Sequence, residues 1–316
     1  MPYIGEVAAL TTAFCWSFTA VFFTEAGRII GSFRVNCIRL LFAVIVYMVM
    51  LYLTTGEFFP RNLNSSQIFW LSLSGFFGLI VGDGCGFKAL VMIGPRLTML
   101  LHATAPIMAT IMAWFFLDER LHWLDLIGIA LTVFGVSWVI MERRFQSSNQ
   151  FNLEKSHPDS GTLLKGVFLG LGAAFGQASG LVLSKYGMLY AGGTVEPMPA
   201  SFIRMFAAGV LIWFFAGLRG EFYHNIKAMK NYKAMLFTGS GALFGPFFGV
   251  WMSLVAVKYI EAGVAATLNS LTPVFIIPVV MIYFKEKVSL RAFLGAVVAV
   301  CGVALLFSGD ALLRLF

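Results

Sequence analysis

The sequence predicts an all-α membrane protein, with ten transmembrane helices arranged as two inverted five-helix repeats. Three observations lead to this prediction. Of the 316 residues, 59% are hydrophobic and only 12% are charged, whereas soluble domains have about 45–50% and about 25%. Ten apolar runs are long enough to cross a bilayer, and the second half of the sequence repeats the first. Lipid must therefore be the solvent for much of this chain.

The apolar runs predict helices because of their length. A crossing helix needs about 20 mostly apolar residues, and long runs without alternation favour helices over the strands of a closed barrel. The first run begins near Gly5, and its length and flanks differ from those of a cleaved signal peptide, so we expect it to be retained. The expected spans are 5–24, 35–53, 67–88, 97–116, 123–141, 165–184, 200–218, 234–256, 263–284 and 289–308.

The repeat is visible as a constant offset of 167 residues. It pairs Pro106 with Pro273 and Gly135 with Gly302, and it changes only further upstream. An odd number of spans in each repeat would give the two repeats opposite orientations. Such inverted repeats are typical of secondary transporters, whose substrate site lies near the bilayer midplane. The expected domains are a first repeat at 5–141, a polar linker at 142–164 and a second repeat at 165–308.

The stretches that both repeats share resemble a known module. "TAPIMATIMAWFFLDERLHWLDLIGIALTVFGV" in the first repeat returns as "LTPVFIIPVVMIYFKEKVSLRAFLGAVVAVCGV" in the second. With "AFCWS" in the first span and "KALVMIGPRLTMLL" across the third-to-fourth hairpin, these stretches are similar to the EamA-type module of the drug/metabolite transporter superfamily. The resemblance covers nearly the whole chain except the linker and the tail. It implies a transporter of small metabolites without indicating which one.

Small residues recur every four positions in the third and eighth spans. This spacing lets helix backbones approach closely in lipid, so we interpret it as helix packing; bending at the glycines during transport is the alternative. "GDGCGF" lacks the GxGxxG spacing, and the sequence contains no GxxxxGK[ST] motif, which argues against nucleotide binding. The packing glycines are Gly78, Gly82, Gly86, Gly241, Gly245 and Gly249.

Asp83 breaks the symmetry of the repeats, because Val250 occupies the equivalent position. It lies ~10 Å inside the third span, where a carboxylate is costly unless it is paired, hydrated or protonated. Its expected partner is His102, which lies about as far beyond the hairpin near 90–96 as Asp83 lies before it. The pair could bind a substrate amine or pass a proton, or it could be a structural hydrogen bond.

Prolines and polar residues at matching places complete the expected site. Pro106 and Pro273 each free a backbone carbonyl and kink a span, and interrupted helices at corresponding places point towards a binding site. Trp16 and Gln177 correspond to each other in the first and sixth spans, although Trp16 could equally be a packing residue. The expected substrate-binding residues are Trp16, Asp83, His102, Gln177, Asn269 and Thr272.

Other charged residues are expected near the membrane boundaries. Arg39 and Arg204 lie one turn into the second and seventh spans, where we expect them to snorkel to the headgroups or to cap a neighbouring helix. The loop residues Glu119 and Glu286 are expected to pair with Arg120, Lys285 or Lys287.

The expected function is a secondary transporter or exporter of small polar metabolites, amino acids among them, working by alternating access. A membrane-embedded sensor, scaffold or enzyme without transport is the alternative. One acid and one histidine lie well inside the spans, and the cysteines lack metal-ligand spacing, so we expect neither an enzyme nor a cofactor or metal site. The expected partners are the substrate, membrane lipid and, as a coupling ion, protons. The net charge of +7 fits anionic headgroups better than nucleic acid.

The location and the orientation follow from separate arguments. We expect a bacterial inner membrane. Lys and Arg concentrate in the loops after the odd-numbered spans, which places both termini outside by the positive-inside rule. The family resemblance implies that both lie inside. We favour the family arrangement, and the sequence leaves both this conflict and the oligomeric state open.

Overall fold

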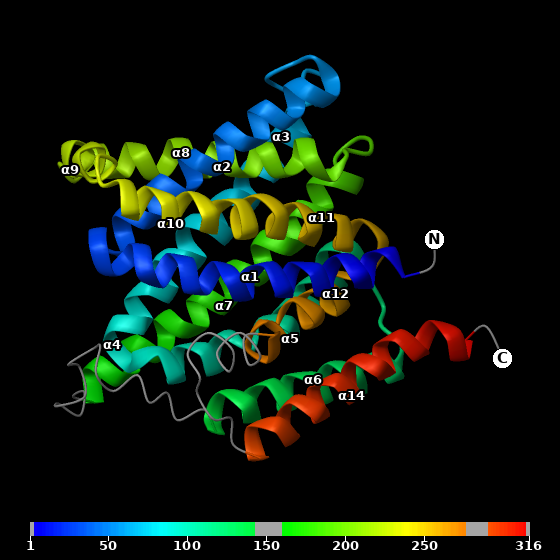
Figure 1. Cartoon of the computed structure of the whole chain (residues 1–316). Helices are drawn as coiled ribbons and strands as arrows, with labels where there is room; N and C mark the ends of the chain where they lie inside the picture. The colour runs from blue at the N-terminus through cyan, green and yellow to red at the C-terminus, as the bar shows by residue number, and fades with distance from the viewer. Residues whose placement is uncertain (1–2, 143–159, 276–289, 314–316) are drawn as a thin grey trace. The chain divides into compact units, whose positions relative to one another are not determined.

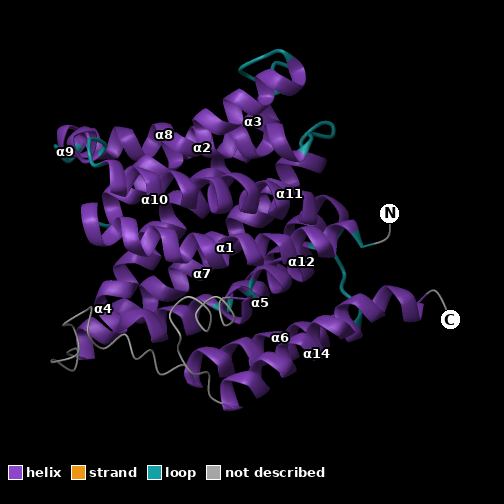
Figure 2. Ribbon diagram, viewed as in Figure 1, coloured by secondary structure: helices purple, strands orange, loops and turns teal. Residues whose placement is uncertain are grey.

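The computed structural model describes residues 3–142, 160–275 and 290–313, and all regular structure in these ranges is helical (Figure 2). The helices are α1 (Ile4–Ile30), α2 (Ser32–Thr55), α3 (Ser65–Gly75), η1 (Phe76–Gly82), α4 (Asp83–His102), α5 (Ala105–Leu117), α6 (Trp123–Glu142), α7 (Ser160–Leu189), α8 (Pro197–Leu218), α9 (Phe222–Ala228), α10 (Tyr232–Ala242), η2 (Leu243–Gly249), α11 (Val250–Tyr259), α12 (Ala262–Asn269) and α14 (Leu290–Leu313).

Eight helical stretches in the described ranges are long and apolar enough to cross a membrane, and they match the first eight expected spans. Of the ninth expected span, 276–284 lies outside the described residues. The tenth coincides with α14, whose described apolar stretch, Phe293–Leu306, is shorter. The count of ten therefore stays a prediction. Most of the expected linker, 143–159, also lies outside the described residues.

The chain forms two compact units that each draw on both halves of the sequence. The first unit comprises Met1–Ile80 and Gly180–Ile260, and the second comprises Val81–Ser179 and Glu261–Phe316. The expected repeats are consecutive stretches of sequence, so they do not coincide with these units. The boundaries of the repeats stay a prediction.

Equivalent asparagines begin the third and eighth spans. The Asn64 side chain accepts a hydrogen bond from the Gln67 amide at 2.8 Å, and the Asn231 side chain accepts one from the Ala234 amide at 3.0 Å. Each side chain satisfies an N–H group that the helix N-terminus would otherwise leave unpaired. Asn231 follows Asn64 by the repeat offset, so α3 and α10 begin at equivalent residues.

A π-helix interrupts each of these spans at equivalent residues. η1 and η2 begin and end at positions related by the same offset, and their hydrogen bonds reach five residues along the chain rather than four. Gly78 and Gly82 lie in η1, and Gly245 and Gly249 lie in η2. A four-residue spacing of glycines suggests a regular α-helix, and it does not reveal this widening.

Close helix packing in the first unit depends on these glycines. A Cβ atom placed on Gly245 would lie 2.7 Å from the Thr19 side chain of α1, and one placed on Gly180 of α7 would lie 2.8 Å from the Gly78 Cα. Backbones approach this closely only where a side chain is missing. α1 thus packs on η2 just as α7 packs on η1.

Four glycines join α6 to α14 in the second unit, where the two helices lie side by side (Figure 1). A Cβ on Gly128 would lie 3.1 Å from the Gly302 carbonyl oxygen, and one on Gly135 would lie 2.7 Å from the Gly295 carbonyl oxygen. The order of these contacts makes the helices antiparallel. Gly128 is equivalent to Gly295, and Gly135 is equivalent to Gly302. The contact of Gly128 with Gly302 therefore corresponds to the contact of Gly295 with Gly135, as a local two-fold axis between the helices would require.

Candidate functional site

The fourth span is interrupted next to its proline. α4 ends at His102 and α5 begins at Ala105, so Ala103 and Thr104 separate the two helices. Pro106 lies in the first turn of α5, where backbone N–H groups have no hydrogen-bond partner within the helix, so the N–H group that proline lacks costs no helical hydrogen bond. The kink expected at Pro106 is therefore a break just before it.

The second repeat breaks at equivalent residues. α12 ends at Asn269, and the helix resumes at Thr272 after Ser270 and Leu271. Pro273 is again the second residue of the resumed helix, which is described as far as Phe275. Helices interrupted at matching places frame the substrate site in many transporters.

Hydroxyl groups satisfy carbonyl oxygens at both breaks. The Thr104 hydroxyl donates to the Leu101 carbonyl at 2.6 Å, and the Thr272 hydroxyl donates to the Asn269 carbonyl at 3.1 Å. A hydroxyl that has donated its one hydrogen can still accept a hydrogen bond. Thr272 would therefore meet a substrate as an acceptor in this arrangement.

The chain reverses direction within α4, although residues 83–102 are all assigned to one helix. A Cβ on Gly172 of α7 would lie 3.4 Å from the Cys85 sulfur, and one on Gly170 would lie 3.1 Å from the Leu101 Cβ. A straight helix would separate Cys85 from Leu101 by about 24 Å, whereas Gly170 and Gly172 are about 3 Å apart along α7. The chain therefore reverses between these two contacts, as the expected hairpin near 90–96 requires.

The reversal places Asp83 and His102 within electrostatic range of each other. Asp83 is the first residue of α4 and His102 is the last, and the Asp83 charge acts on the His102 side chain. Both residues are partly buried. Their direct pairing and their role in binding substrate stay predictions.

Gln177 lies level with Asp83 along the neighbouring helix. A Cβ atom placed on Gly86 of α4 would lie 3.5 Å from the Ala173 Cβ of α7. A Cβ atom placed on Gly166 of α7 would meet the Ile93 side chain of α4. α7 therefore runs antiparallel to the first part of α4. Asp83 lies three residues before Gly86 and Gln177 four after Ala173, so they lie within about 2 Å of the same height.

Asn269 lies at the level of the break between α4 and α5. Its Oδ1 atom is buried and has no hydrogen-bond partner among the described residues. The amide of Ala262, at the start of α12, donates to Glu119 beyond the end of α5 at 2.7 Å, and Gly263 meets Thr110 in mid-helix. α12 thus runs towards the start of α5. Asn269, the last residue of α12, lies six residues or about 9 Å beyond Gly263, which brings it to the level of the break.

Trp16 belongs to the first unit, apart from the other expected substrate-binding residues, all of which lie in the second. A Cβ on Gly249 would lie 3.1 Å from the Trp16 Nε1 atom, so the indole rests against η2. This contact fits the packing alternative for Trp16. A role in lining the substrate pathway stays a prediction.

Arg39 and Arg204 are buried, which contradicts the expectation that they snorkel and leaves the capping of a neighbouring helix as a prediction. They are only 4% and 5% exposed. The Arg39 Nε atom donates to the Asn36 side chain at 2.7 Å, whereas the Arg204 Nε atom has no hydrogen-bond partner among the described residues. A hydropathy pattern places both near the ends of their spans, but it does not show which helix face points inward.

Lys185 is a buried charge that the sequence analysis did not single out. It is 7% exposed, and its Nζ donates to the Ile260 carbonyl at the end of α11 at 2.6 Å. A cation is favourable at a helix C-terminus. The expected sixth span ends at 184, whereas α7 continues to Leu189, so Lys185 lies just beyond the expected span but inside the helix.

Glu119 caps a helix in addition to any surface pairing. Its Oε2 atom accepts the Ala262 amide hydrogen described above, while Arg120 forms an ion pair with Asp118 at 3.5 Å. Glu286, Lys285 and Lys287 lie outside the described residues.

The chain matches the model of the EamA-like transporter family over residues 3–141 and 164–308. It belongs to that family. This EamA-like protein is accordingly a multi-pass integral membrane protein and a membrane transporter, in a family of transporters rather than enzymes.

Known relatives and one solved structure agree with this assignment. The EamA-like chain is 23% identical over 301 residues to an uncharacterized transporter of Archaeoglobus fulgidus, covering 94% of this chain and 96% of that protein. It is 28% identical over 132 residues to an uncharacterized transporter of Clostridium kluyveri, an alignment that spans only 42% of either chain. A crystal structure with 15% sequence identity superposes with a TM-score of 0.71 over 96% of both chains, which shows a shared fold.

Proposed function

We propose that this transporter moves small polar metabolites with an amino group, amino acids among them, through a site around the two helix breaks. The proposal is supported by Asp83 and His102, which lie within electrostatic range of each other, by Gln177 at the height of Asp83 on the neighbouring helix, and by Asn269 at the level of the break beside His102. A carboxylate in a membrane span is a candidate functional group by default.

The chemistry of these groups favours a substrate with a positive and a negative end. The Asp83 carboxylate can accept hydrogen bonds from a substrate ammonium, and the buried Asn269 Oδ1 atom can accept another. The N-terminus of α5 offers N–H groups and a positive dipole end to a substrate carboxylate. Asp83 and His102 are also the groups that could carry a coupling proton.

Alternating access between two inverted five-helix repeats is the mechanism that we propose. It is supported by the antiparallel pairing of α6 with α14 and by π-helices and breaks at equivalent residues of both halves. Inverted repeats let one arrangement convert into its mirror counterpart across the membrane. Export from the cell, a ten-span topology and a bacterial inner membrane belong to the same proposal.

Substitution of Asp83 tests the site. Amino acids and other amines would be screened for thermal stabilisation of the purified protein and for flux into proteoliposomes between pH 5.5 and 8. We expect Asp83→Asn to weaken substrate affinity, as measured by thermal stabilisation, at least tenfold, because it removes the anionic acceptor. A tenfold change in the dissociation constant corresponds to about 1.4 kcal/mol.

Asp118→Asn is the matched control, because the Asp118 side chain is 83% exposed in the loop after α5. It should retain wild-type binding and flux. Full binding and transport by Asp83→Asn at every pH would show that the site assignment is wrong, and the absence of flux for every metabolite with an intact fold would count against transport.

A further inference from the structure

An apolar groove lies at the end of α8 in the first unit. It has a volume of about 450 Å³ and is lined by Trp213, Phe214, Gly217, Leu218 and Phe222. α8 is a membrane span that ends at Leu218, so the groove lies where this span leaves the hydrocarbon. Two of its lining side chains have partners. The Trp213 indole N–H donates to the Cys37 carbonyl at 3.0 Å, and the rings of Trp213 and Phe222 meet edge to face at 5.5 Å.

Gly217 creates the hollow. A Cβ atom at this position would have no heavy atom within 4 Å, so no neighbouring helix requires a glycine here. Glycine inside a helix costs about 1 kcal/mol relative to alanine. Close helix packing explains Gly78 and Gly180, but it does not explain Gly217, which leaves an exposed depression on an apolar helix face.

Four cations follow closely in the sequence after the end of α8 that borders the groove. Arg219 directly follows α8, Lys227 lies in α9, Lys230 follows it, and Lys233 lies in the first turn of α10. All four are exposed, and none pairs with a carboxylate within the described part of the chain. α9 lies at this end of α8 and α2 (Figure 1).

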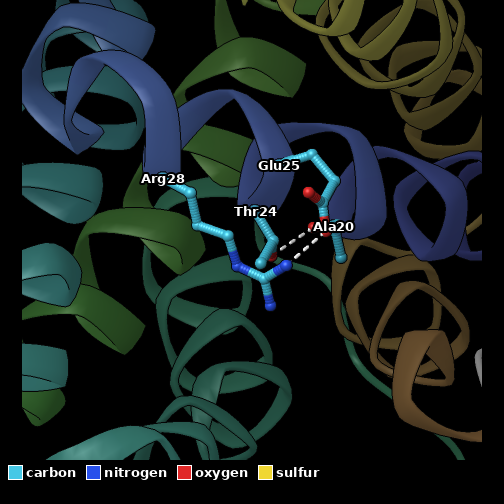
Figure 3. A network of polar contacts seen from close by, with 4 residues as sticks. All are labelled: Ala20, Thr24, Glu25 and Arg28. Carbon is cyan, nitrogen blue, oxygen red and sulfur yellow. Dashed lines mark hydrogen bonds and ion pairs between the residues drawn. The ribbon is translucent and has the colours of Figure 1, made fainter. Parts of the chain in front are cut away.

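The nearby acids are already engaged with other cations. Glu221 forms an ion pair with Arg34 at 3.4 Å. Glu25 accepts a hydrogen bond from Arg28 at the end of α1, beside the Thr24 hydroxyl that bonds to the Ala20 carbonyl (Figure 3). The four cations that follow α8 therefore keep their positive charge uncompensated by these carboxylates.

The equivalent connection in the first repeat lacks this charge. The segment 56–64 joins α2 to α3 and carries Glu57 and Arg61, which pair with each other at 3.5 Å. The cation cluster is therefore a property of the second repeat alone and is not a requirement of the shared fold.

We propose that the groove holds one acyl chain of an anionic phospholipid, with its headgroup phosphate bound by Arg219 and attracted by Lys227, Lys230 and Lys233. An apolar trough in the hydrocarbon below a cluster of cations matches the two ends of such a lipid. The exposed rings of Tyr223 and Tyr232 are suited to the same headgroup region.

Native mass spectrometry of the full-length protein tests the proposal. The protein would be presented with an equimolar mixture of phosphatidylglycerol and phosphatidylcholine. We expect retained phosphatidylglycerol, and we expect Gly217→Trp to remove it by filling the groove. Val210→Trp is the matched control, because Val210 is also an exposed residue of α8 and lies two turns away from Gly217.

The charge is tested separately from the shape. Arg219→Gln with Lys227→Gln leaves the groove intact, and it should reduce the preference for phosphatidylglycerol about fivefold for each cation removed. A monodisperse elution profile would establish that each variant folds. Equal retention of the two lipids by the wild type, or retention that Gly217→Trp leaves unchanged, would overturn the proposal. Transport activity is not part of the readout, so a failure here is distinct from a failure of the proposed function.

Discussion

At the scale of single residues, Tyr47 shows how a π-helix is held in place. Tyr47 of α2 is fully buried, and its hydroxyl donates to the Phe247 carbonyl at 2.8 Å and lies 3.3 Å from the Pro246 carbonyl. Both carbonyls belong to η2, where Pro246 removes an N–H group from the helix. A side chain on another helix thus adds a donor to two carbonyl groups of the irregular helix.

Removal of this hydroxyl should destabilise the protein. Tyr47→Phe removes a buried hydrogen bond to the Phe247 carbonyl, which also accepts the Val250 amide hydrogen, and this should cost about 0.5–1.5 kcal/mol of unfolding free energy. Tyr52→Phe is the control, because Tyr52 is 49% exposed on the same helix, and it should change the stability little. Thermal unfolding in detergent measures both. Equal effects of the two substitutions would contradict a specific role for the Tyr47 hydroxyl.

Asp83 and Lys185 show which single residues a sequence can reveal. The sequence predicts that Asp83 and His102 lie at similar depth, because a hairpin places residues equally far from its turn at equal depth. The partner of Lys185 could not be predicted, because Ile260 is 75 residues away and contributes a backbone carbonyl, which has no residue signature. The burial of Arg39 and Arg204 could not be predicted, because hydropathy indicates how deep a residue lies in the membrane but not whether its side chain points towards lipid or towards other helices.

At the scale of elements, the repeat offset predicted equivalent helices, and the structure places their ends at equivalent residues. The breaks near Pro106 and Pro273 could be predicted because proline cannot continue a helix normally. The π-helices could not be predicted, because widening depends on hydrogen-bond partners around Gly78 and Gly245 and not on composition. The asparagine caps were readable in principle, since Asn64 has a glutamine three residues later, a capping-box pattern.

The glycine contacts between α6 and α14 should not tolerate even a methyl group. A Cβ on Gly135 would collide with the Ala299 backbone and lie 2.7 Å from the Gly295 oxygen. Since backbone atoms cannot rotate away, Gly135→Ala should cost about 1–3 kcal/mol, measured by thermal unfolding. Gly27→Ala, where nothing lies within 4 Å, should be neutral or stabilising by up to about 1 kcal/mol. A neutral Gly135→Ala would refute the close approach.

At the scale of the whole molecule, the feature to test is the number of times the chain crosses the membrane. Eight described helices can cross a membrane, and ten crossings are proposed. Composition alone was enough to predict a membrane protein, and the stretches that both repeats share resemble the EamA-type module closely enough to predict the family. The two compact units could not be predicted, because each combines residues from both halves.

Reporters fused before Met1 and after Phe316 would test the proposed topology. An even number of crossings puts both ends on one side, and we expect both reporters to be active on the cytoplasmic side, following the family arrangement. Alkaline phosphatase and a fluorescent protein report opposite sides. Signals from opposite sides would exclude ten crossings, and periplasmic activity at both ends would favour the distribution of Lys and Arg over the family arrangement.

The matching spacing of cap, π-helix and break in the two halves decides where the chain can accept extra residues. Between Asn64 and Asp83, one inserted residue would turn every later side chain in the helix by ~100° and advance it by 1.5 Å, so the Asp83 side chain would move to another face of its helix. Between Gly56 and Leu63, the same insertion only lengthens a largely exposed connection. Epitope tags and labelling sites therefore belong in that connection, where they leave the geometry of both breaks unchanged.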